Sequence, residues 1–427
     1  MKVAFCTLGC KVNQYESQSM EQALIKRGFE CVEASEEADV YIVNSCTVTA
    51  ESDRKTRQNV RHLRKLHPDA VIVLTGCMPQ AFPEDARLLT QADIVTGNRS
   101  NKQIPDMIDE FFRTRERIVR IAQHENGEKF SGELINDFRE RTRATVKIED
   151  GCNRFCSYCV IPYARGRVRS KPLEDIREEI SSLEKKGFSE IVLVGINLSA
   201  YGTDCGASIC DAVELAASFD GIKRVRLGSL EPDHMTPDVT KRLAECKKLC
   251  PQFHISLQSG CDKTLKRMNR HYTAAEYEEL CTRLRSEFED ATLTTDVMVG
   301  FSGETKEDFE ISRDFVKKIG FEKVHVFPYS RRAGTRAAEF PDVVENAEKE
   351  HRSREMIAAA GEVRHEFLER QIGRTVEVLF EEKLRDGSIQ GYTANYTPVR
   401  IKSGCTHGLR KVKITACGDD WCEGELI

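Results

Sequence analysis

The chain has 427 residues, of which 31% are charged and 40% are hydrophobic, and its formal net charge is −5. This length is too great for one ordinary hydrophobic core and predicts about two to four domains. A mean hydropathy of −0.46 argues against an integral membrane protein, and Lys11, Asn13 and Gln14 interrupt the first apolar run too early for a signal peptide. We therefore expect a cytoplasmic protein with no membrane partner.

Seventeen cysteines are the most unusual feature of the composition. Cytosolic thiols are kept reduced and the count is odd, so a disulfide framework is not expected and metal or redox chemistry is favoured. The net charge gives no sign of a basic protein, so a polyanionic partner would have to be bound by local basic patches.

Residues 1–112 predict an α/β domain with a parallel sheet, because strand-like runs alternate with helical patterns. The strand-like runs are residues 2–7, 40–45, 70–75 and 93–97, and the helical patterns are residues 16–27 and 54–66. Residues 113–144 are charged and aperiodic, and we expect a linker with room for a strand.

Residues 145–370 predict a partial TIM-like (β/α)6 barrel closed by a long polar helix over 345–370. Its six strand-like runs are 145–148, 190–196, 223–229, 252–259, 293–301 and 323–330, and the first five are each followed by a loop and a helical stretch. Residues 371–427 change to short strands separated by turn signals, which predicts a small antiparallel β-barrel.

The stretch "DGCNRFCSYC" places Cys152, Cys156 and Cys159 in the loop after the first barrel strand. Active sites of such barrels lie at this end of the strands. Three thiolates on a four-iron cluster leave one iron open to a small chelating ligand. The spacing therefore predicts a 4Fe–4S cluster whose fourth position is filled by a substrate or cofactor. A zinc site with a distant fourth ligand is the alternative, although zinc ligands usually come as C-x-x-C pairs.

A second set of three cysteines is predicted by the topology of the first domain. Cys10, Cys46 and Cys77 each follow one of its first three long strands. Parallel strands bring their carboxyl ends to one edge of a sheet, where such sheets bind ligands. These three thiols should therefore converge on a second metal site.

The other eleven cysteines are expected to be structural. Cys6 and Cys31 lie in apolar runs and should be core thiols. The same is expected of Cys205, Cys210, Cys261, Cys281, Cys405, Cys417 and Cys422. Cys246 and Cys250 stand four residues apart on a predicted helix and could share one face of it.

The stretch "GCNRFCSYCVIPYARG" resembles the cluster loop of radical S-adenosylmethionine enzymes, in particular the methylthiotransferases. The stretches "TLGCKVNQYES" and "NSCTVTAESDRKTRQ" resemble the N-terminal domain of that family, and the chain from about residue 371 resembles its TRAM RNA-binding domain. "SCTVTAESDRK" and "HVFPYSRRAGTRA" are most similar to the branch that modifies N6-threonylcarbamoyladenosine at tRNA position 37. Asn197 stands where that branch is expected to have histidine.

This resemblance implies a transferase that converts the C2–H group of the adenine to C2–SCH3 by radical chemistry. It implies two 4Fe–4S clusters, one on each cysteine triad, with S-adenosylmethionine as both radical source and methyl donor. The implied partners are a tRNA anticodon loop, a low-potential electron donor and a sulfur donor. Related substrates are isopentenyladenosine in tRNA and an aspartate of a ribosomal protein, and a zinc-binding RNA-binding protein is a rival of a different class.

The resemblance also implies site residues beyond the six cysteines. Positions that match cofactor-binding places of the superfamily are Tyr158, Gly195, Asn197, Ser229, Glu231, Gln258 and Gly300. The threonylcarbamoyl group carries a carboxylate, which a guanidinium can bind with two parallel hydrogen bonds. The candidates for this contact are Arg165, Arg331 and Arg332.

Two further regions are expected to contact RNA. Basic residues in the helix around 53–67, together with Arg167 and Arg169, should lie near phosphates. The C-terminal segment has no excess of basic residues, so its role in RNA binding rests on the resemblance and on Tyr392 and Tyr396, which could instead be core residues.

Overall fold

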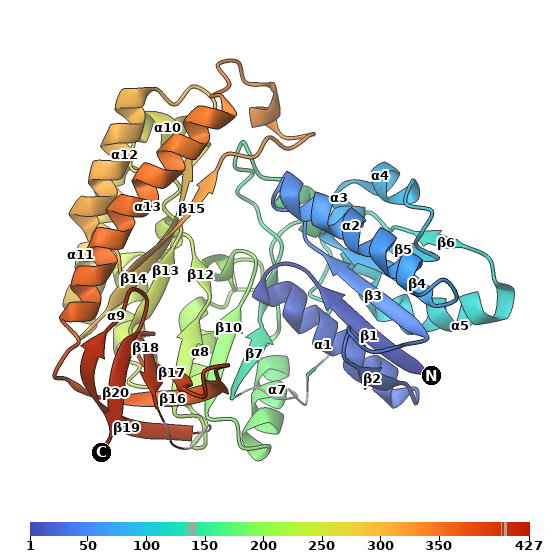
Figure 1. Ribbon diagram of the computed structural model, residues 1–427, viewed down its shortest axis with the longest axis horizontal. Helices are drawn as coiled ribbons and strands as arrows, with labels where there is room; N and C mark the ends of the chain where they lie inside the picture. The colour runs from blue at the N-terminus through green and yellow to red at the C-terminus, as the bar shows by residue number, and fades with distance from the viewer. Residues whose placement is uncertain (133, 136–141, 403, 405–407) are drawn as a thin grey trace.

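The structure, a computed structural model, describes residues 1–132, 134–135, 142–402, 404 and 408–427. It consists of an N-terminal α/β domain, a central partial barrel and a small C-terminal barrel beneath the central one (Figure 1). This is the fold class that the sequence predicts. In the described part of the chain, no helix is long and apolar enough to cross a membrane.

The N-terminal domain is built on a six-stranded parallel sheet in the order β2-β1-β3-β4-β5-β6. Its strands are β1 (Lys2–Thr7), β2 (Glu30–Val32), β3 (Val40–Ser45), β4 (Val71–Gly76), β5 (Ile94–Thr96) and β6 (Ile118–Arg120). The last strand lies in the segment for which we expected a linker. Strand order reverses between β1 and β3, and sheets of this type bind ligands at such a switch point.

Helices cover both faces of this sheet because its strands are apolar on both sides. One face packs on α1 (Lys11–Lys26) and α5 (Ile104–Thr114). The other packs on α2 (Ala50–Leu66) and the short helices α3 (Cys77–Ala81) and α4 (Pro83–Arg87). The start of α1 also contacts the central barrel, where Tyr15 joins the barrel core.

The central barrel is open, with parallel strands in two groups ordered β11-β10-β7 and β12-β13-β14-β15. The strands are β7 (Arg143–Lys147), β10 (Glu190–Val194), β11 (Arg224–Leu227), β12 (Ser229–Leu230), β13 (Gln252–Ile255), β14 (Thr292–Val299) and β15 (Lys323–Pro328). The third predicted strand is divided at Gly228, whose N–H donates a hydrogen bond to the Leu193 carbonyl at 2.8 Å. A short pair, β8 (Glu149–Asp150) and β9 (Arg169–Ser170), borders the cysteine loop.

Helices surround the outer side of the barrel and share one large apolar core with its strands (Figure 1). They are α7 (Leu173–Lys185), α8 (Ile209–Ala217), α9 (Pro237–Ala244), α10 (Asp262–Arg267), α11 (Ala274–Glu287), α12 (Lys306–Ile319) and α13 (Asn346–Glu369). The short helix α6 (Ile161–Arg165) instead packs against α3 of the N-terminal domain. The long helix predicted over 345–370 is α13. The helix predicted around Cys246 and Cys250 is wrong: α9 ends at Ala244, and both cysteines lie in the following turn. Pro251 disfavours helical backbone at the residue before it.

The C-terminal strands form a closed barrel in the order β16-β17-β18-β20-β19. They are β16 (Thr375–Lys383), β17 (Ile389–Thr393), β18 (Pro398–Ile401), β19 (Gly408–Cys417) and β20 (Cys422–Leu426). The pairs are antiparallel except β18 with β20, which is parallel.

This small barrel closes the base of the central one. Thr292 donates a hydrogen bond to the Asn395 carbonyl at 2.6 Å, and Arg226 donates to the Ala394 carbonyl at 3.0 Å. The rings of Tyr392 and Tyr396 stack 4.5 Å apart, and the Arg226 guanidinium lies over Tyr396. Both tyrosines are therefore half-buried at the interface between the barrels.

Candidate active site

Cys10, Cys46 and Cys77 converge at the switch point of the N-terminal sheet. Cys10 is the residue before α1, Cys46 follows β3, and Cys77 begins α3. The Asn13 side-chain oxygen lies 3.6 Å from the Cys10 sulfur and 3.9 Å from the Cys77 sulfur. A Cβ atom on Gly9, whose φ is +118°, would lie 2.9 Å from the Cys46 Cβ. Glycine is therefore needed where the first loop passes the second cysteine.

Asn13 organises this edge of the sheet, and sequence reasoning missed its role. Its side chain is 1% exposed. Its amide nitrogen donates to the carbonyls of Leu8 and Ser45, each at 2.9 Å, which ties the loop after β1 to the loop after β3. Its position three residues after Cys10, in the first turn of the helix, is the signal that could have found it.

Cys152, Cys156 and Cys159 lie together in the loop between β8 and α6. A Cβ on Gly151, whose φ is +91°, would lie 2.0 Å from the Arg167 carbonyl oxygen, so only glycine allows the loop to fold back here. Arg270 donates to the Cys156 sulfur at 3.3 Å and also pairs with Glu231. Arg270 is a second site residue that no sequence motif identified.

Four of the six thiols are poor anions in the absence of a metal. Burial raises the pKa of Cys152 and of Cys77 to about 12 in each case. Burial likewise raises the pKa of Cys46 and of Cys159. Cysteine binds metals as the thiolate, and a bound metal compensates the cost of burying that charge. Two groups of three cysteines, in which four thiols have raised pKa values and an arginine donates to Cys77 and to Cys156, fit metal ligation better than redox reactivity of free thiols.

The spacing of the sulfur atoms argues against a single zinc ion in either triad. Within the described residues, only one group of three histidine, cysteine or acidic side chains has its ligand atoms within 4.8 Å of one another, and it contains no cysteine. Zinc–sulfur bonds of about 2.3 Å would bring the sulfurs to roughly 4 Å from one another. The wider separation suits a polynuclear cluster, whose irons bind one cysteine each.

Arg165 connects the two triads. It is the last residue of α6, which begins two residues after Cys159. Its guanidinium donates to the Cys77 sulfur at 3.2 Å and to the Asn13 oxygen at 2.8 Å, and it pairs with Glu16. The side chain is 0% exposed. The barrel loop that carries one triad therefore contacts the other triad directly.

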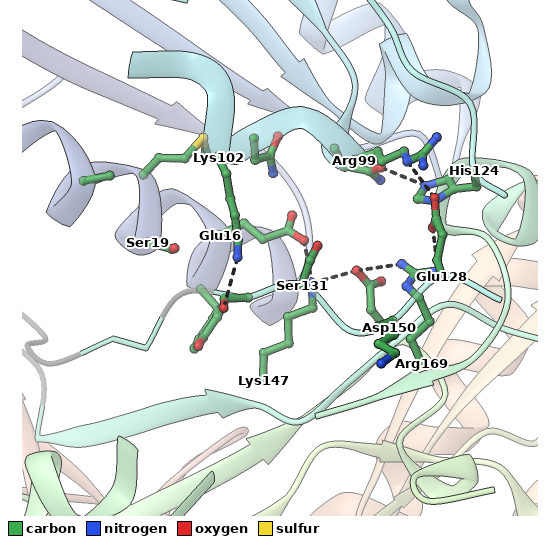
Figure 2. A pocket seen from close by; sticks show the side chains of 17 residues that line it. Glu16, Ser19, Arg99, Lys102, His124, Glu128, Ser131, Lys147, Asp150 and Arg169 are labelled. Atoms are coloured by element: carbon green, nitrogen blue, oxygen red, sulfur yellow. Dashed lines mark hydrogen bonds and ion pairs between the residues drawn. The ribbon is translucent and has the colours of Figure 1, made fainter. Parts of the chain in front are cut away.

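A buried network of charges lies beside this contact, and Figure 2 shows four of its members, Glu16, Lys147, Asp150 and Arg169, on the wall of a neighbouring pocket. Lys147 of β7 lies 2.8 Å from the Glu16 carboxylate and 2.7 Å from that of Asp150. Burial alone would raise the pKa of Glu16, but Arg165 and Lys147 outweigh it and hold that pKa below its ordinary value. The pKa of Asp150 is lowered as well, by Lys147, Arg165 and Arg169 against the opposing effect of burial. Glu16, Asp150, Lys147 and Arg165 thus all remain charged and are paired inside the domain interface.

A cavity of about 930 Å³ lies in the lumen of the central barrel. Cys10 of the N-terminal triad reaches its wall, as do Gly195 and Ser229 from the barrel strands and Tyr392 from the C-terminal barrel. Many of the barrel side chains that line it are polar or charged: Gln252, His254, Thr292, Thr294, Asp296, Glu322, Lys323 and His325. All three parts of the chain contribute to this cavity.

The residues expected to bind a cofactor are distributed around the barrel loop and the cavity. Gly195 and Ser229 line the cavity, and Glu231 reaches the Cys156 sulfur through Arg270. Asn197 donates its N–H to Glu149 at 2.7 Å, and its buried side-chain oxygen has no partner among the described residues. An unpartnered buried acceptor of this kind is costly unless a ligand supplies a donor.

The other three residues of this group, Tyr158, Gln258 and Gly300, are not among the residues that line the cavity. Tyr158 packs edge-on against Phe301 at 6.2 Å between ring centroids. Gly300 and Gln258 have φ values of +69° and +65°, so each adopts a left-handed conformation at the end of a strand. These placements leave their predicted cofactor role as a prediction.

The structure does not support the prediction that Arg165 and Arg332 bind the substrate carboxylate, because both guanidinium groups are already paired with acidic side chains of the protein. Arg165 is committed to Glu16 and Cys77, as described above. Arg332 is 4% exposed and donates to Asp53 at 2.6 Å and to Thr47 at 2.8 Å. Both arginines join domains instead.

Of the three predicted carboxylate partners, Arg331 alone is exposed. Arg169 is also buried, whereas Arg167 is exposed.

The remaining cysteines mostly follow the expectation of burial. Cys210, Cys250, Cys261, Cys281 and Cys422 are buried, and Cys6, Cys31, Cys246 and Cys417 are half-buried. Cys205 is exposed in a turn, so the prediction of a core thiol is wrong there. Cys405 lies outside the described residues.

Comparisons with known proteins match both large domains. The uncharacterised protein family UPF0004 matches residues 2–97, and the Radical SAM superfamily matches residues 146–316. The threonylcarbamoyladenosine tRNA methylthiotransferase MtaB of Bacillus subtilis is 35% identical over 100% of this chain and 96% of its own length. That of Thermotoga maritima is 37% identical over 99% and 96%. A tRNA-2-methylthio-N(6)-dimethylallyladenosine synthase from Carboxydothermus hydrogenoformans is 36% identical over 99% and 98%.

Among solved structures, the radical S-adenosylmethionine methyltransferase TsrM from Kitasatospora setae, with cobalamin and a [4Fe–4S] cluster bound, superposes with a TM-score of 0.57. It is 14% identical and covers 87% of this chain and 78% of its own. At this level of identity the likeness concerns the fold.

Replacing Arg165 by methionine is expected to lower the free energy of unfolding by about 3 to 5 kcal/mol, because Glu16 would remain buried without its guanidinium partner. Urea denaturation followed by circular dichroism measures the change. Arg167→Met is the matched control, since Arg167 is exposed and only stacks on Phe155 at 4.5 Å. Its cost should be at most about 1 kcal/mol. Equal losses in both variants would contradict a structural role special to Arg165.

The ion pairs of Glu16 should also make the stability of the folded protein depend on pH. A carboxylate with a lowered pKa in the folded state stabilises the protein above its unfolded pKa of about 4.3, and that stabilisation is lost as the pH falls through the folded value. The difference in Tm between wild type and Glu16→Gln should therefore be largest near neutral pH and shrink below about pH 4.3. Thermal scans across this range test the sign; a difference that grows in acid would exclude an ionised Glu16.

Proposed function

The chain belongs to the methylthiotransferase family of radical S-adenosylmethionine enzymes, and we propose that it converts N6-threonylcarbamoyladenosine at position 37 of tRNA to its 2-methylthio derivative. Identity does not by itself select this substrate, because relatives named for threonylcarbamoyladenosine and for dimethylallyladenosine are similarly close. The observation that favours N6-threonylcarbamoyladenosine over dimethylallyladenosine is the polar lining of the barrel cavity.

A polar cavity suits a polar substituent on the adenine. The threonylcarbamoyl group carries a carboxylate, a hydroxyl and a urea-like linkage, all of which need hydrogen-bond partners when they leave water. An isopentenyl group has no donor or acceptor to offer this polar wall and would displace water from it without replacing the lost hydrogen bonds. A site built from polar groups rejects an analogue that lacks the matching groups.

Lys323 replaces the buried arginines as the proposed partner of the substrate carboxylate. It lines the cavity and is exposed, and its side chain makes no ion pair or hydrogen bond with any residue in the described ranges. A lysine held at a cavity wall with no internal partner can form a charge-assisted hydrogen bond with an incoming carboxylate.

The two cysteine triads fit iron–sulfur clusters. Cys152, Cys156 and Cys159 would hold the cluster that binds S-adenosylmethionine, and Cys10, Cys46 and Cys77 would hold a second one. The C2–H bond of adenine is neither acidic enough for a general base nor open to displacement, so radical chemistry is required. When bound, the clusters and S-adenosylmethionine supply three things: the sulfur, the methyl group, and the radical that removes this hydrogen.

The protein residues provide position and shielding for that chemistry. Arg270 holds Glu231 and contacts Cys156, which orients the barrel loop. The buried oxygen of Asn197 offers an acceptor to a cofactor amine or hydroxyl. Arg165 and Asn13 fix the N-terminal triad beside the barrel and exclude water from the space between them.

The basic face of α2 supports binding of the tRNA backbone. Arg54, Lys55, Arg61 and Lys65 are exposed along this helix. The first turn of α2 contacts Ser330, next to the exposed Arg331, because the Ala50 N–H donates to the Ser330 hydroxyl at 3.1 Å. Phosphates would therefore be bound across both domains, by α2 and by Arg331. Cytoplasmic location, a low-potential electron donor and a sulfur donor complete the proposal.

The division of labour between the triads predicts separable defects. Changing Cys152, Cys156 and Cys159 together to alanine should remove about half of the iron and abolish 5′-deoxyadenosine formation. Changing Cys10, Cys46 and Cys77 together should also remove about half of the iron, yet spare cofactor cleavage while blocking methylthiolation. Iron analysis and chromatography of reconstituted enzyme test this, with Cys205→Ala as the control. Full iron in either triple variant would refute the two-cluster assignment.

Lys323→Gln should lower kcat/KM for tRNA carrying N6-threonylcarbamoyladenosine by about tenfold or more, the loss expected for one charge-assisted hydrogen bond. Lys241→Gln, on the exposed side of α9, serves as the matched control and should have no effect. Wild type should not process tRNA that lacks the threonylcarbamoyl group or carries isopentenyladenosine. Efficient turnover of the isopentenylated tRNA would overturn the substrate, whereas full activity of Lys323→Gln would overturn only the residue.

A further inference from the structure

Three side chains with metal-binding atoms, none of them a cysteine, meet on one wall of the barrel cavity. They are His254 of β13, Asp296 of β14 and His325 of β15, which are neighbouring strands. In the parallel register Asp296 stands opposite His325, while His254 stands opposite Thr294, two residues before Asp296. Side chains alternate along a strand, so these positions all face the lumen.

The ligand atoms of these residues are close enough to share one ion. The three atoms lie within 4.8 Å of one another, and within the described residues no other histidine, cysteine or acidic trio is so compact. The His254 Nε2 atom lies 3.4 Å from an Asp296 carboxylate oxygen. Metal bonds of about 2.0 to 2.2 Å place neighbouring ligand atoms roughly 3 to 3.5 Å apart, so only a small contraction is required.

The surroundings fix the His254 ring in a metal-binding orientation. Its Nδ1 atom lies 3.0 Å from the Thr294 hydroxyl, which leaves Nε2 directed at Asp296. Metal-binding histidines usually have their second nitrogen held by a hydrogen bond of this kind. The His325 side chain has no hydrogen bond or ion pair with any described residue, although its ring lies 6.0 Å from the His254 ring. A simple ion pair between His254 and Asp296 would not require this third group.

We propose that His254, Asp296 and His325 form a mononuclear site for a divalent cation of the zinc class. Two imidazoles and one carboxylate are a common ligand set for such ions in sites that keep coordination positions open. All three ligands come from one wall, so the open positions face the cavity. An oxygen anion bound in the cavity can occupy them.

This site goes beyond the proposed function and does not depend on it. If the substrate is N6-threonylcarbamoyladenosine, the ion adds a second positive centre near Lys323, which lies two residues before His325 on the same face of β15. If the substrate is different, the same ligands still bind the metal. Metal binding and substrate choice are therefore tested separately.

The test uses the enzyme with both clusters reconstituted, so that the six cysteines are occupied, and zinc as the probe. After incubation with zinc and gel filtration, wild type should retain about one zinc ion per chain. X-ray absorption at the zinc edge should show nitrogen and oxygen ligands at about 2.0 to 2.2 Å rather than sulfur at about 2.3 Å. Absence of retained zinc, or a sulfur shell, would overturn the proposal.

Substitutions test which side chains bind the zinc ion. Asp296→Asn and His325→Gln should each weaken zinc binding by more than about tenfold, and Thr294→Val, which keeps the shape but removes the orienting hydroxyl, by about tenfold. His351→Gln is the control, because His351 is exposed on α13 beside Glu355. Unchanged iron content reports that each variant is folded. Zinc affinity equal to wild type in both ligand variants would overturn the site.

Discussion

The contact of Arg165 with Cys77, Asn13 and Glu16 is the constraint on which the arrangement of the site depends. The arginine belongs to the helix that follows one cysteine triad, and its guanidinium ends at the other. A fully buried guanidinium is tolerated only when every donor is used, and here carboxylate, amide oxygen and sulfur all accept from it. The positions of the two triads relative to one another are therefore set by one side chain that has little freedom to move.

The open central barrel explains why three domains are needed for one cavity. Strands β7 and β15 are left as edges. The N-terminal domain contacts both sides of this opening, through α1 against β7 and through Asp53 with Arg332 beyond the end of β15. The C-terminal barrel covers the base through Asn395 and Ala394. An incomplete barrel thus gains a lumen that is wide enough for a modified nucleoside and connected to Cys10.

Much of the fold could be predicted from local patterns. Apolar β-branched runs of four to eight residues marked the long strands, and their alternation with helices indicated parallel sheets. The strand broken at Gly228 and the turn at Cys246 were missed, because a single glycine or a following proline changes local geometry without changing the hydrophobic pattern. Strand β6 lies in the charged segment for which a linker with room for a strand was expected, and its bounds follow from its pairing with β5 rather than from composition.

The sequence by itself determined which cysteines form the two triads, because one triad is encoded in ten consecutive residues and the other in the ends of three parallel strands. It could not determine which arginines are buried and paired and which are exposed. Arg165 and Arg331 look alike in the chain, yet one is fully buried and the other exposed. Tertiary structure alone decided this, and it alone brought His254, Asp296 and His325 together. Charge pairing and metal-binding geometry depend on distances between distant segments, and those distances are fixed only when strand register and domain packing are fixed.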